Sequence, residues 1–206
     1  MSEKNVYNEL KKQIILLEQK PGEVLREKEI MEAFAVSRTP VREAMMRLEM
    51  DGLVRIIPNV GSFVEEVSFQ KLKDVFEIRS HLVKLTGSLA AARISAEEIA
   101  EIRERITEMK VATDIERLME LDSEIHTIIN TATRNDILIK MLKGLHDQAV
   151  RIWKYAGAAK EYWQNLDQEF AEIAEALAEH DEERAASLLE RHADNFSEHI
   201  RGQLTF

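Results

Sequence analysis

The sequence contains no cysteine, and its prolines and glycines are scarce. The absence of cysteine among 206 residues excludes disulfide bonds and thiolate metal sites, and is typical of a reducing compartment. Only three prolines and seven glycines interrupt the chain, which favours long helices. The first residues are mostly polar, and no apolar run approaches the roughly 20 residues that a membrane-spanning helix needs. We therefore expect a soluble cytoplasmic protein with no membrane segment.

The negative charge is concentrated in the second part of the chain. The formal net charge is −10. Residues 1–66 hold ten Lys and Arg against twelve Asp and Glu, a net charge of −2, so residues 67–206 carry −8. A chain of this length suits two domains, and we place their boundary after residue 66. Because the first domain is not basic overall, a DNA site on it must be a local patch of positive charge.

The stretch from Ser37 to Val64 has the pattern of a helix followed by a β-hairpin. Thr39 is a suitable N-cap and Pro40 a suitable first helical residue, because the missing N–H of proline has no helical partner at that position. Gly52 is suited to end the helix in a left-handed conformation. Two strands, at 53–57 and 62–66, flank turn residues at 58–61. A basic helix followed by a small hairpin predicts a winged helix-turn-helix.

Two further helices are expected before this one. An apolar stripe at helical spacing runs from Val6 to Leu17 and ends at a stop signal over 20–22. The segment 27–34 follows as a second short helix, and 35–37 links it tightly to the arginine-bearing helix. Two short helices joined by such a turn, the second of them basic, are typical of a DNA-binding helix-turn-helix.

The rest of the chain is helical nearly throughout. Ser95 and Glu98 form a capping box, and Asp114 and Asn135 are good N-caps. Because the connections are short, neighbouring helices should run antiparallel in an all-α bundle. The helices are expected at 69–93, 95–111, 114–133, 135–156, 159–180 and 181–203.

Arg38 and Arg42 are the candidates for reading DNA bases. They lie four residues apart at the start of the basic helix, so both guanidinium groups can enter one groove. An arginine can bond to O6 and N7 of guanine in the major groove, and each good pair contributes about 1–3 kcal/mol of discrimination. The alternative is that these arginines only solvate the helix surface and pair with its acidic residues Glu43, Glu49 and Asp51.

Phosphate and minor-groove contacts are expected from the neighbouring polar residues. The hydroxyls of Ser37 and Thr39, with the first amides of the helix, are suited to bind phosphate oxygens and set the register. Asn59 and Gly61 at the tip of the hairpin are placed to reach an adjacent minor groove, where glycine allows a close approach of the backbone.

Asp122 and His126 lie four residues apart on one predicted helix. This spacing stacks their side chains on the same face, and neighbouring leucines and isoleucines suggest that the face is buried. A buried carboxylate and imidazole need partners, which a divalent metal can supply. The alternatives are a hydrogen-bonded Asp–His pair or an exposed pair. Arg79 lies on another apolar stripe, where a buried guanidinium requires an anion.

The first 66 residues resemble the GntR family of bacterial transcription regulators. The resemblance rests on P-G-E-V-L-R-E-K-E-I, V-S-R-T-P-V-R-E-A-M-M-R-L-E-M-D-G-L-V and P-N-V-G-S-F-V. The helical remainder resembles the FadR-like subgroup with its FCD effector domain, through Arg79, L-D-S-E-I-H and I-A-E-A-L-A-E-H-D-E-E-R-A-A-S-L-L-E-R-H. The resemblance implies base contacts for Arg38 and Arg42, and adds a DNA contact for Lys28.

The resemblance also implies a metal site. Many members of the subgroup hold a metal with an Asp and a His four residues apart and two later histidines spaced by 22 residues. Asp122, His126 and His192 match, but the remaining position is Phe170. Three ligands can still hold Zn²⁺ or Ni²⁺, and Asp167, one turn before Phe170, is a candidate replacement.

An effector is expected near this metal site. In the family the arginine that matches Arg79 faces the ligand cavity, which implies an effector that bears a carboxylate. Phe170 would make that cavity more apolar than usual. We leave the other histidines, at 81, 146, 180 and 199, as ordinary surface or core residues.

The sequence therefore predicts a homodimeric repressor that binds a palindromic operator and senses a small molecule in its helical domain. Two alternatives stay open at this point. In the first, the bundle serves only to dimerise the regulator. In the second, the chain is a helical metal-dependent hydrolase, which the strong DNA motif and the lack of a general base disfavour.

Overall fold

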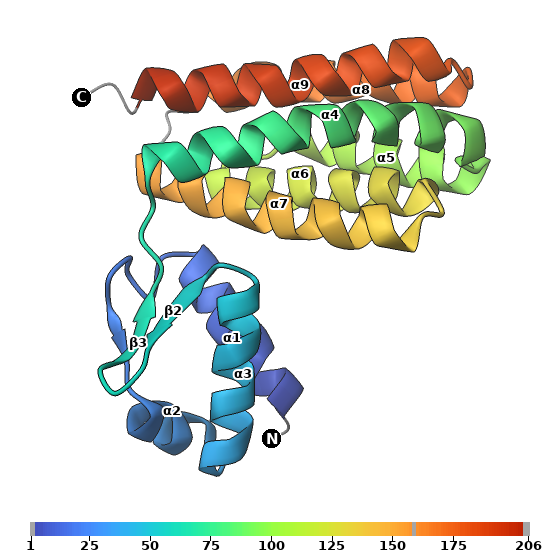
Figure 1. The fold of residues 1–206 in the computed structure, drawn as a ribbon. Coiled ribbons are helices and arrows are strands. Elements are labelled where there is room, and N and C mark those ends of the chain that lie inside the picture. Colours follow the sequence, from blue (N-terminus) through green and yellow to red (C-terminus); the bar gives the residue numbers. More distant parts are fainter. Residues whose placement is uncertain (1–2, 158–159, 204–206) are drawn as a thin grey trace. The chain divides into compact units, whose positions relative to one another are not determined.

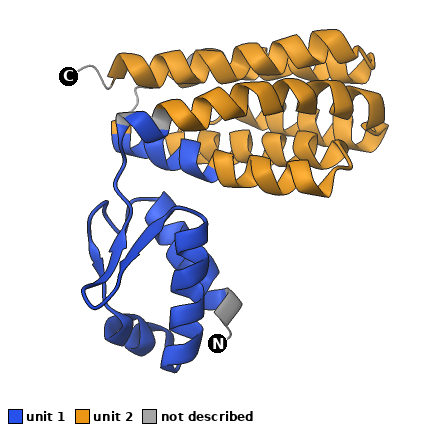
Figure 2. Cartoon of the chain, in the orientation of Figure 1, with its two compact units in different colours: residues 1–72, 147–155 blue, residues 73–146, 156–206 orange. Residues whose placement is uncertain are grey.

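The computed structural model describes residues 3–157 and 160–203. The chain divides into two compact units, and each is described by itself (Figures 1 and 2). The first unit comprises residues 1–72 and 147–155, and the second comprises 73–146 and 156–206. The predicted class, a winged helix-turn-helix followed by an all-α bundle, is confirmed.

The first unit is a three-helix domain with a small sheet. In chain order its elements are α1 (Glu3–Ile15), β1 (Val24–Leu25), α2 (Glu27–Phe34), α3 (Arg38–Met50), β2 (Val54–Ile57) and β3 (Gly61–Val64). The sheet order is β1-β3-β2, with both pairs antiparallel. The sequence predicted the hairpin but not the pairing of β1 with β3. Apolar side chains of all three helices and the sheet form one core: Val6, Leu10, Ile14, Leu25, Ile30, Val41, Ala44, Met45, Leu48, Leu53, Val54 and Val64.

The start of α3 differs from the prediction. Ser37, in an extended conformation with φ −75° and ψ 174°, is the N-cap, and the helix begins at Arg38. Thr39 is therefore inside the helix rather than its cap, and Pro40 is the third helical residue. The proline is tolerated there because the first N–H groups of any helix lack intrahelical partners. Gly52, with φ +67°, follows the helix as predicted.

Residues with left-handed backbone lie at the turns of this unit, and Ala35, with φ 51°, is one of them, directly after α2. Leu17 has φ 61°, and α1 ends at Ile15, earlier than the stop signal at 20–22. At the hairpin tip Asn59 has φ 62°, a conformation that asparagine tolerates better than most residues. The wing strands are shorter than predicted and begin at Val54 and Gly61.

The second unit is a bundle of long helices. The helices of the C-terminal part are α4 (Phe69–Arg93), α5 (Ala96–Met109), α6 (Ile115–Ala132), α7 (Asp136–Ala156), α8 (Leu166–Ala178) and α9 (Glu182–Gln203) (Figure 1). The capping box of Ser95 and Glu98 is present, and Asp114 accepts a hydrogen bond from the amide of Glu116. These caps satisfy amides that the helix itself leaves without acceptors.

The predicted helix at 159–180 is interrupted. A 3₁₀ helix, η1 (Lys160–Asn165), comes first, and α8 begins only at Leu166. Residues 158 and 159 lie outside the described residues. Trp163 is only 8% exposed, so burial of this large side chain stabilises a tight turn where helical periodicity alone predicted a straight helix.

The end of α7 belongs to the first unit. Lys11 of α1 pairs with Asp147 at 2.9 Å and with Asp51 at 2.9 Å. Gln148 donates a hydrogen bond to the carbonyl oxygen of Asp51. Arg151, only 2% exposed, donates to the carbonyl oxygen of Glu65. The boundary after residue 66 stays a prediction. The structure shows in addition that a later segment, residues 147–155, belongs to the first unit.

Among the described helices, none is both long and apolar enough to cross a membrane.

Candidate functional site

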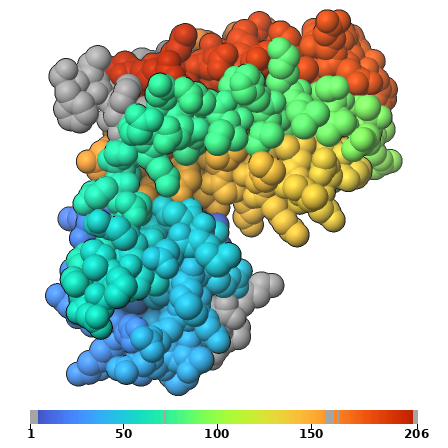
Figure 3. Space-filling model, in the orientation of Figure 1, coloured from blue at the N-terminus to red at the C-terminus, as the bar shows by residue number. Residues whose placement is uncertain are grey.

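The predicted base readers lie exposed at the start of α3. The side chains of Arg38 and Arg42 are 68% and 66% exposed. Both pair with Glu27, the first residue of α2, at 3.2 Å and 3.1 Å. Neither arginine pairs with Glu43, Glu49 or Asp51, the acidic residues of the alternative interpretation. The segment from α3 to the wing forms part of the surface of the first unit (Figure 3).

The predicted phosphate contacts surround these arginines. Ser37 and Thr39 are exposed, and the hydroxyl of Ser37 makes no capping hydrogen bond. It is therefore available to another acceptor or donor, as are the first amides of α3. Lys28 follows Glu27 directly, and its side chain is 87% exposed, with Glu32 3.9 Å away. These positions agree with DNA binding, although their roles stay predictions.

The tip of the wing exposes Asn59 and has an unusual backbone conformation at Gly61. Asn59 is exposed and Gly61 is partly exposed. Gly61 has φ +153°, a backbone conformation that residues with a Cβ rarely adopt. A side chain there would strain the turn, so the wing keeps a bare backbone at this point.

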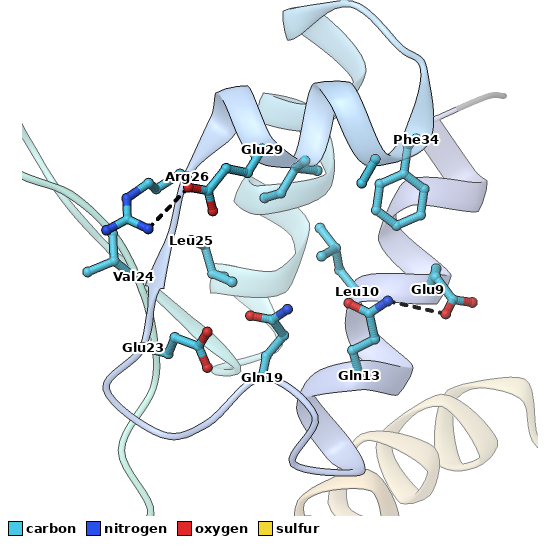
Figure 4. A pocket seen from close by; sticks show the side chains of 12 residues that line it. Glu9, Leu10, Gln13, Gln19, Glu23, Val24, Leu25, Arg26, Glu29 and Phe34 are labelled. Atoms are coloured by element: carbon cyan, nitrogen blue, oxygen red, sulfur yellow. Dashed lines mark hydrogen bonds and ion pairs between the residues drawn. The ribbon is translucent and has the colours of Figure 1, made fainter.

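A recess on the first unit is unsuited to DNA. It has a volume of about 630 Å³ and lies between α1, β1 and α2 (Figure 4). Its rim carries Glu9, Glu23 and Glu29 against the single cation Arg26. Carboxylates repel phosphates, so the start of α3, rather than this recess, suits a nucleic acid.

A second candidate site lies inside the bundle, where Asp122, His126 and His192 converge. Nε2 of His126 is 3.2 Å from Nε2 of His192. Oδ1 of Asp122 is 3.7 Å and 3.9 Å from these nitrogens. Four-coordinate Zn²⁺ with bonds of about 2.1 Å has ligand atoms roughly 3.4 Å apart. The three ligand atoms therefore fit around one such ion.

Glu169 sets the orientation of His192. Its carboxylate lies 2.8 Å from Nδ1 of His192, so Nδ1 donates its proton there and the lone pair of Nε2 faces the cluster. Burial acts to raise the pKa of Glu169, but the hydrogen bonds from His192 and Asn195 and the charges of His192 and Arg191 together outweigh it, so the net pKa is lowered. Burial, and next the charge of His192, hold the pKa of His126 well below its usual range. A neutral imidazole is the form that binds a metal.

Phe170 occupies the side of the cluster where the family pattern has a histidine. It is fully buried, and its ring centre lies 5.6 Å from that of His126 and 4.9 Å from that of His192. Asp167 does not replace the missing ligand. Among the described residues the possible ligands are the three named above, and Asp167 lines a separate recess with Met109 and Trp163.

Arg79 is buried beside this cluster without an ion-pair partner among the described residues. It is 5% exposed, and its guanidinium lies over the ring of Phe196 at 5.6 Å. Burial lowers its pKa, while the charge of Asp122 acts in the opposite direction. Burial also raises the pKa of Tyr162, which shares this environment. A cation in such surroundings is suited to receive an anion.

His146, which we expected to be an ordinary surface or core residue, is part of the same environment. Its Nε2 lies 2.9 Å from the hydroxyl of Ser123, and its ring centre is 5.5 Å from that of His126. Burial, and next the charges of Arg79 and His192, lower the pKa of His146 to about 3. The ring is therefore neutral at neutral pH. His146 belongs to no sequence motif, so the sequence contained no signal for its place in this environment.

Two family models match this chain, one in each part. The family model described as bacterial regulatory proteins, gntR family, matches residues 2–64, and the FCD domain model matches residues 74–195. The chain belongs to the gntR family and carries an FCD domain. It is thus a DNA-binding transcription regulator rather than an enzyme.

Several regulators are similar to this GntR protein along most of their length. The Nta operon transcriptional regulator of Aminobacter aminovorans is 28% identical over 90% of each chain. The HTH-type transcriptional repressor RspR of Escherichia coli (strain K12) is 25% identical over 95% of this chain and 87% of its own. The solved structure of E. coli McbR/YncC shares the fold, with a TM-score of 0.86, 24% identity and 98% of both chains covered.

The GntR and FCD pattern selected the candidate DNA-contact and metal-ligand positions, but not the residues that contact them. Glu27, Glu169 and His146 enter the two sites through contacts between elements. Glu169 had one available signal, because it directly precedes the position where the family pattern has its histidine.

Proposed function

We propose that this regulator binds an inverted-repeat operator as a homodimer, with Arg38 and Arg42 reading guanines in the major groove. The observation that carries the proposal is the exposure of both guanidinium groups at the first turn of α3. Ser37, Thr39 and Lys28 would bind phosphates and set the register. The wing, with Asn59 and Gly61, would contact an adjacent minor groove. Two-fold symmetry of the dimer would be mirrored in the operator. Binding to operator DNA would place the protein in the bacterial cytoplasm.

Asp122, His126 and His192 would hold one Zn²⁺ or Ni²⁺ ion. FCD domains commonly bind a metal, and the separations of the three ligand atoms, 3.2 to 3.9 Å, support one here. The ion would supply a positive charge with coordination positions left for an oxygen ligand. Glu169 holds His192 in the required tautomer.

The effector would be a small carboxylate held by Arg79 and the metal. A buried guanidinium with no carboxylate at ion-pair distance among the described residues supports this, because an anionic ligand would compensate the charge. The enclosed ring of Phe170 would favour an effector with an apolar portion.

Helix α7 is suited to transmit the signal. His146 lies next to His126, and the adjoining residues Asp147 and Gln148 contact the winged helix. An effector can shift operator affinity only through its different affinity for two conformations. The alternative, a bundle that only dimerises, predicts no such shift.

The DNA proposal is tested with duplexes that the full-length protein selects from a random-sequence pool. Affinity for a selected duplex is compared with that for a scrambled duplex at one salt concentration. Arg38→Ala and Arg42→Ala should each lower this ratio by about 10-fold to 100-fold, whereas Lys12→Ala on the exposed face of α1 should leave it unchanged. Equal weakening on both duplexes would mean that the arginines touch only phosphate.

The effector is tested in the same assay with Zn²⁺ and a panel of small carboxylates. An active carboxylate should change operator affinity of the wild type and leave Arg79→Gln unresponsive, while Arg79→Gln keeps its affinity without effector. If carboxylates bind yet operator affinity never changes, the dimerisation-only alternative gains support.

A further inference from the structure

One carboxylate joins both arginines at the start of α3. Oε2 of Glu27 is 3.2 Å from Nε of Arg38, and Oε1 is 3.1 Å from Nε of Arg42. The contact to Arg42 is also a hydrogen bond. Glu27 is the first residue of α2, so this contact crosses between the two helices of the helix-turn-helix. No other described residue pairs with either guanidinium.

The atoms involved leave the reading edge of each arginine open. A guanidinium has five N–H donors, one on Nε and two on each terminal nitrogen. Because Glu27 engages Nε in both cases, the terminal nitrogens remain available to bond to O6 and N7 of a guanine. The side chain of Glu27 is 33% exposed, about half as exposed as either arginine, so the carboxylate is less accessible to DNA than the two guanidinium groups.

We propose that Glu27 is a specificity-determining residue that positions Arg38 and Arg42 for base reading. The inference rests on the proposed function of these two arginines. By fixing both side chains before DNA binds, Glu27 reduces the rotamer freedom that binding would otherwise remove. It also lowers the local charge, because two cations and one carboxylate carry only one net positive charge. Affinity for any phosphate backbone is thereby weakened relative to affinity for the operator.

If Glu27 only stabilised α2, replacing it would have the same effect as replacing another carboxylate in that first turn. A carboxylate in the first turn of α2 stabilises that helix through its interaction with the helix dipole. Glu29 lies in the same turn and pairs with Arg26 at 3.2 Å (Figure 4). Glu29→Gln therefore removes the same charge from the same helix without touching Arg38 or Arg42, and is the matched control for Glu27→Gln.

The experiment measures affinity of the full-length protein for a selected duplex and for its scrambled version. Glu27→Gln should lower the ratio of the two affinities by about tenfold, mainly because binding to the scrambled duplex becomes tighter. Glu29→Gln should leave the ratio within about twofold of wild type. Glu27→Asp keeps the charge but shortens the reach, and should lower the ratio without tightening non-specific binding. Thermal unfolding of each variant reports any loss of the fold.

A double-mutant cycle separates the two proposals. In the background of Arg38→Ala with Arg42→Ala, Glu27→Gln should cause no further loss of discrimination. If the arginine variants lose discrimination while Glu27→Gln behaves like Glu29→Gln, only the role of Glu27 is overturned. If the arginine variants keep full discrimination, the base-reading proposal fails and the role of Glu27 fails with it.

Discussion

At the scale of single residues, Phe170 decides how many protein ligands the cluster of Asp122, His126 and His192 can offer a metal ion. Phe170 packs its ring against His126 and His192 where the family pattern has a ligand. The remaining three ligand atoms keep separations that suit one ion. Phe170 thus adds a fully buried apolar ring to the bundle core, and three residues remain that could hold an ion.

Phe170→His should strengthen metal binding and weaken the metal-free fold. An added imidazole ligand should raise Zn²⁺ affinity by at least about tenfold. Without metal, a buried imidazole lacking a partner should lower the free energy of unfolding by about 1–3 kcal/mol. Chelator competition measures the affinity, and denaturant unfolding measures the stability.

Phe170→Leu is the control for this variant, because it removes the ring without adding a ligand. It should lower stability and leave Zn²⁺ affinity unchanged. Unchanged Zn²⁺ affinity in Phe170→His would show that position 170 does not face the ion.

At the scale of elements, the packing of α4 against α9 depends on a glycine. A Cβ built on Gly87 would lie 2.6 Å from the carbonyl oxygen of Ala185 and 2.6 Å from Cα of Ala186. These are backbone atoms, so no side-chain movement relieves the contact. Two alanines facing one glycine let the two helix backbones approach closely, which positions Arg79 of α4 and His192 of α9 in one bundle core.

Gly87→Ala should therefore lower the free energy of unfolding by about 1–3 kcal/mol through overpacking. Gly144 in α7 provides the opposite case, because a Cβ there would meet no atom within 4 Å. Gly144→Ala should raise stability by about 0.5–1 kcal/mol, since alanine is the better helix former. Urea unfolding of both variants checks the pair, and a neutral Gly87→Ala would contradict the close approach.

At the scale of the whole molecule, α7 is one helix that belongs to both units. Its residue His146 lies beside His126, and its next residue, Asp147, pairs with Lys11 of the winged helix. Burial acts to lower the pKa of Lys11, but the charge of Asp147 and the hydrogen bonds with Asp147, Asp51 and Tyr7 together outweigh it, so the net pKa is raised. Because the folded-state pKa lies above the unfolded value, this stabilisation is fully present at neutral pH and is lost only in strongly alkaline solution.

Lys11→Met should weaken communication between the effector and the operator. The variant removes the ion pairs of Lys11 with Asp147 and Asp51, so the last part of α7 is held less firmly to α1 and α3. We expect the effector-induced change in operator affinity to fall by about threefold or more, with metal binding unchanged. Operator titrations with and without effector measure this change.

Lys12→Met on the exposed face of α1 is the matched control and should respond like wild type. An undiminished response in Lys11→Met would show that the signal reaches the DNA-binding unit by another route.

The sequence by itself determined the elements and several of their faces. Helical spacing, turn residues and caps such as Ser95 with Glu98 act within a few residues, so α2, α4 and the capping box agree with prediction. The same local logic placed Asp122 and His126 on one helix face. It failed at η1, where burial of Trp163 outweighs helical periodicity.

Only the tertiary structure decided which faces meet. His192 lies 66 residues beyond His126 in the sequence, yet their Nε2 atoms are 3.2 Å apart. Glu169 behind His192 and Glu27 between Arg38 and Arg42 likewise act across elements. A local pattern fixes the backbone conformation and the direction of a side chain within its own helix. The partner of that side chain depends on how distant apolar faces pack, which no short stretch of sequence contains.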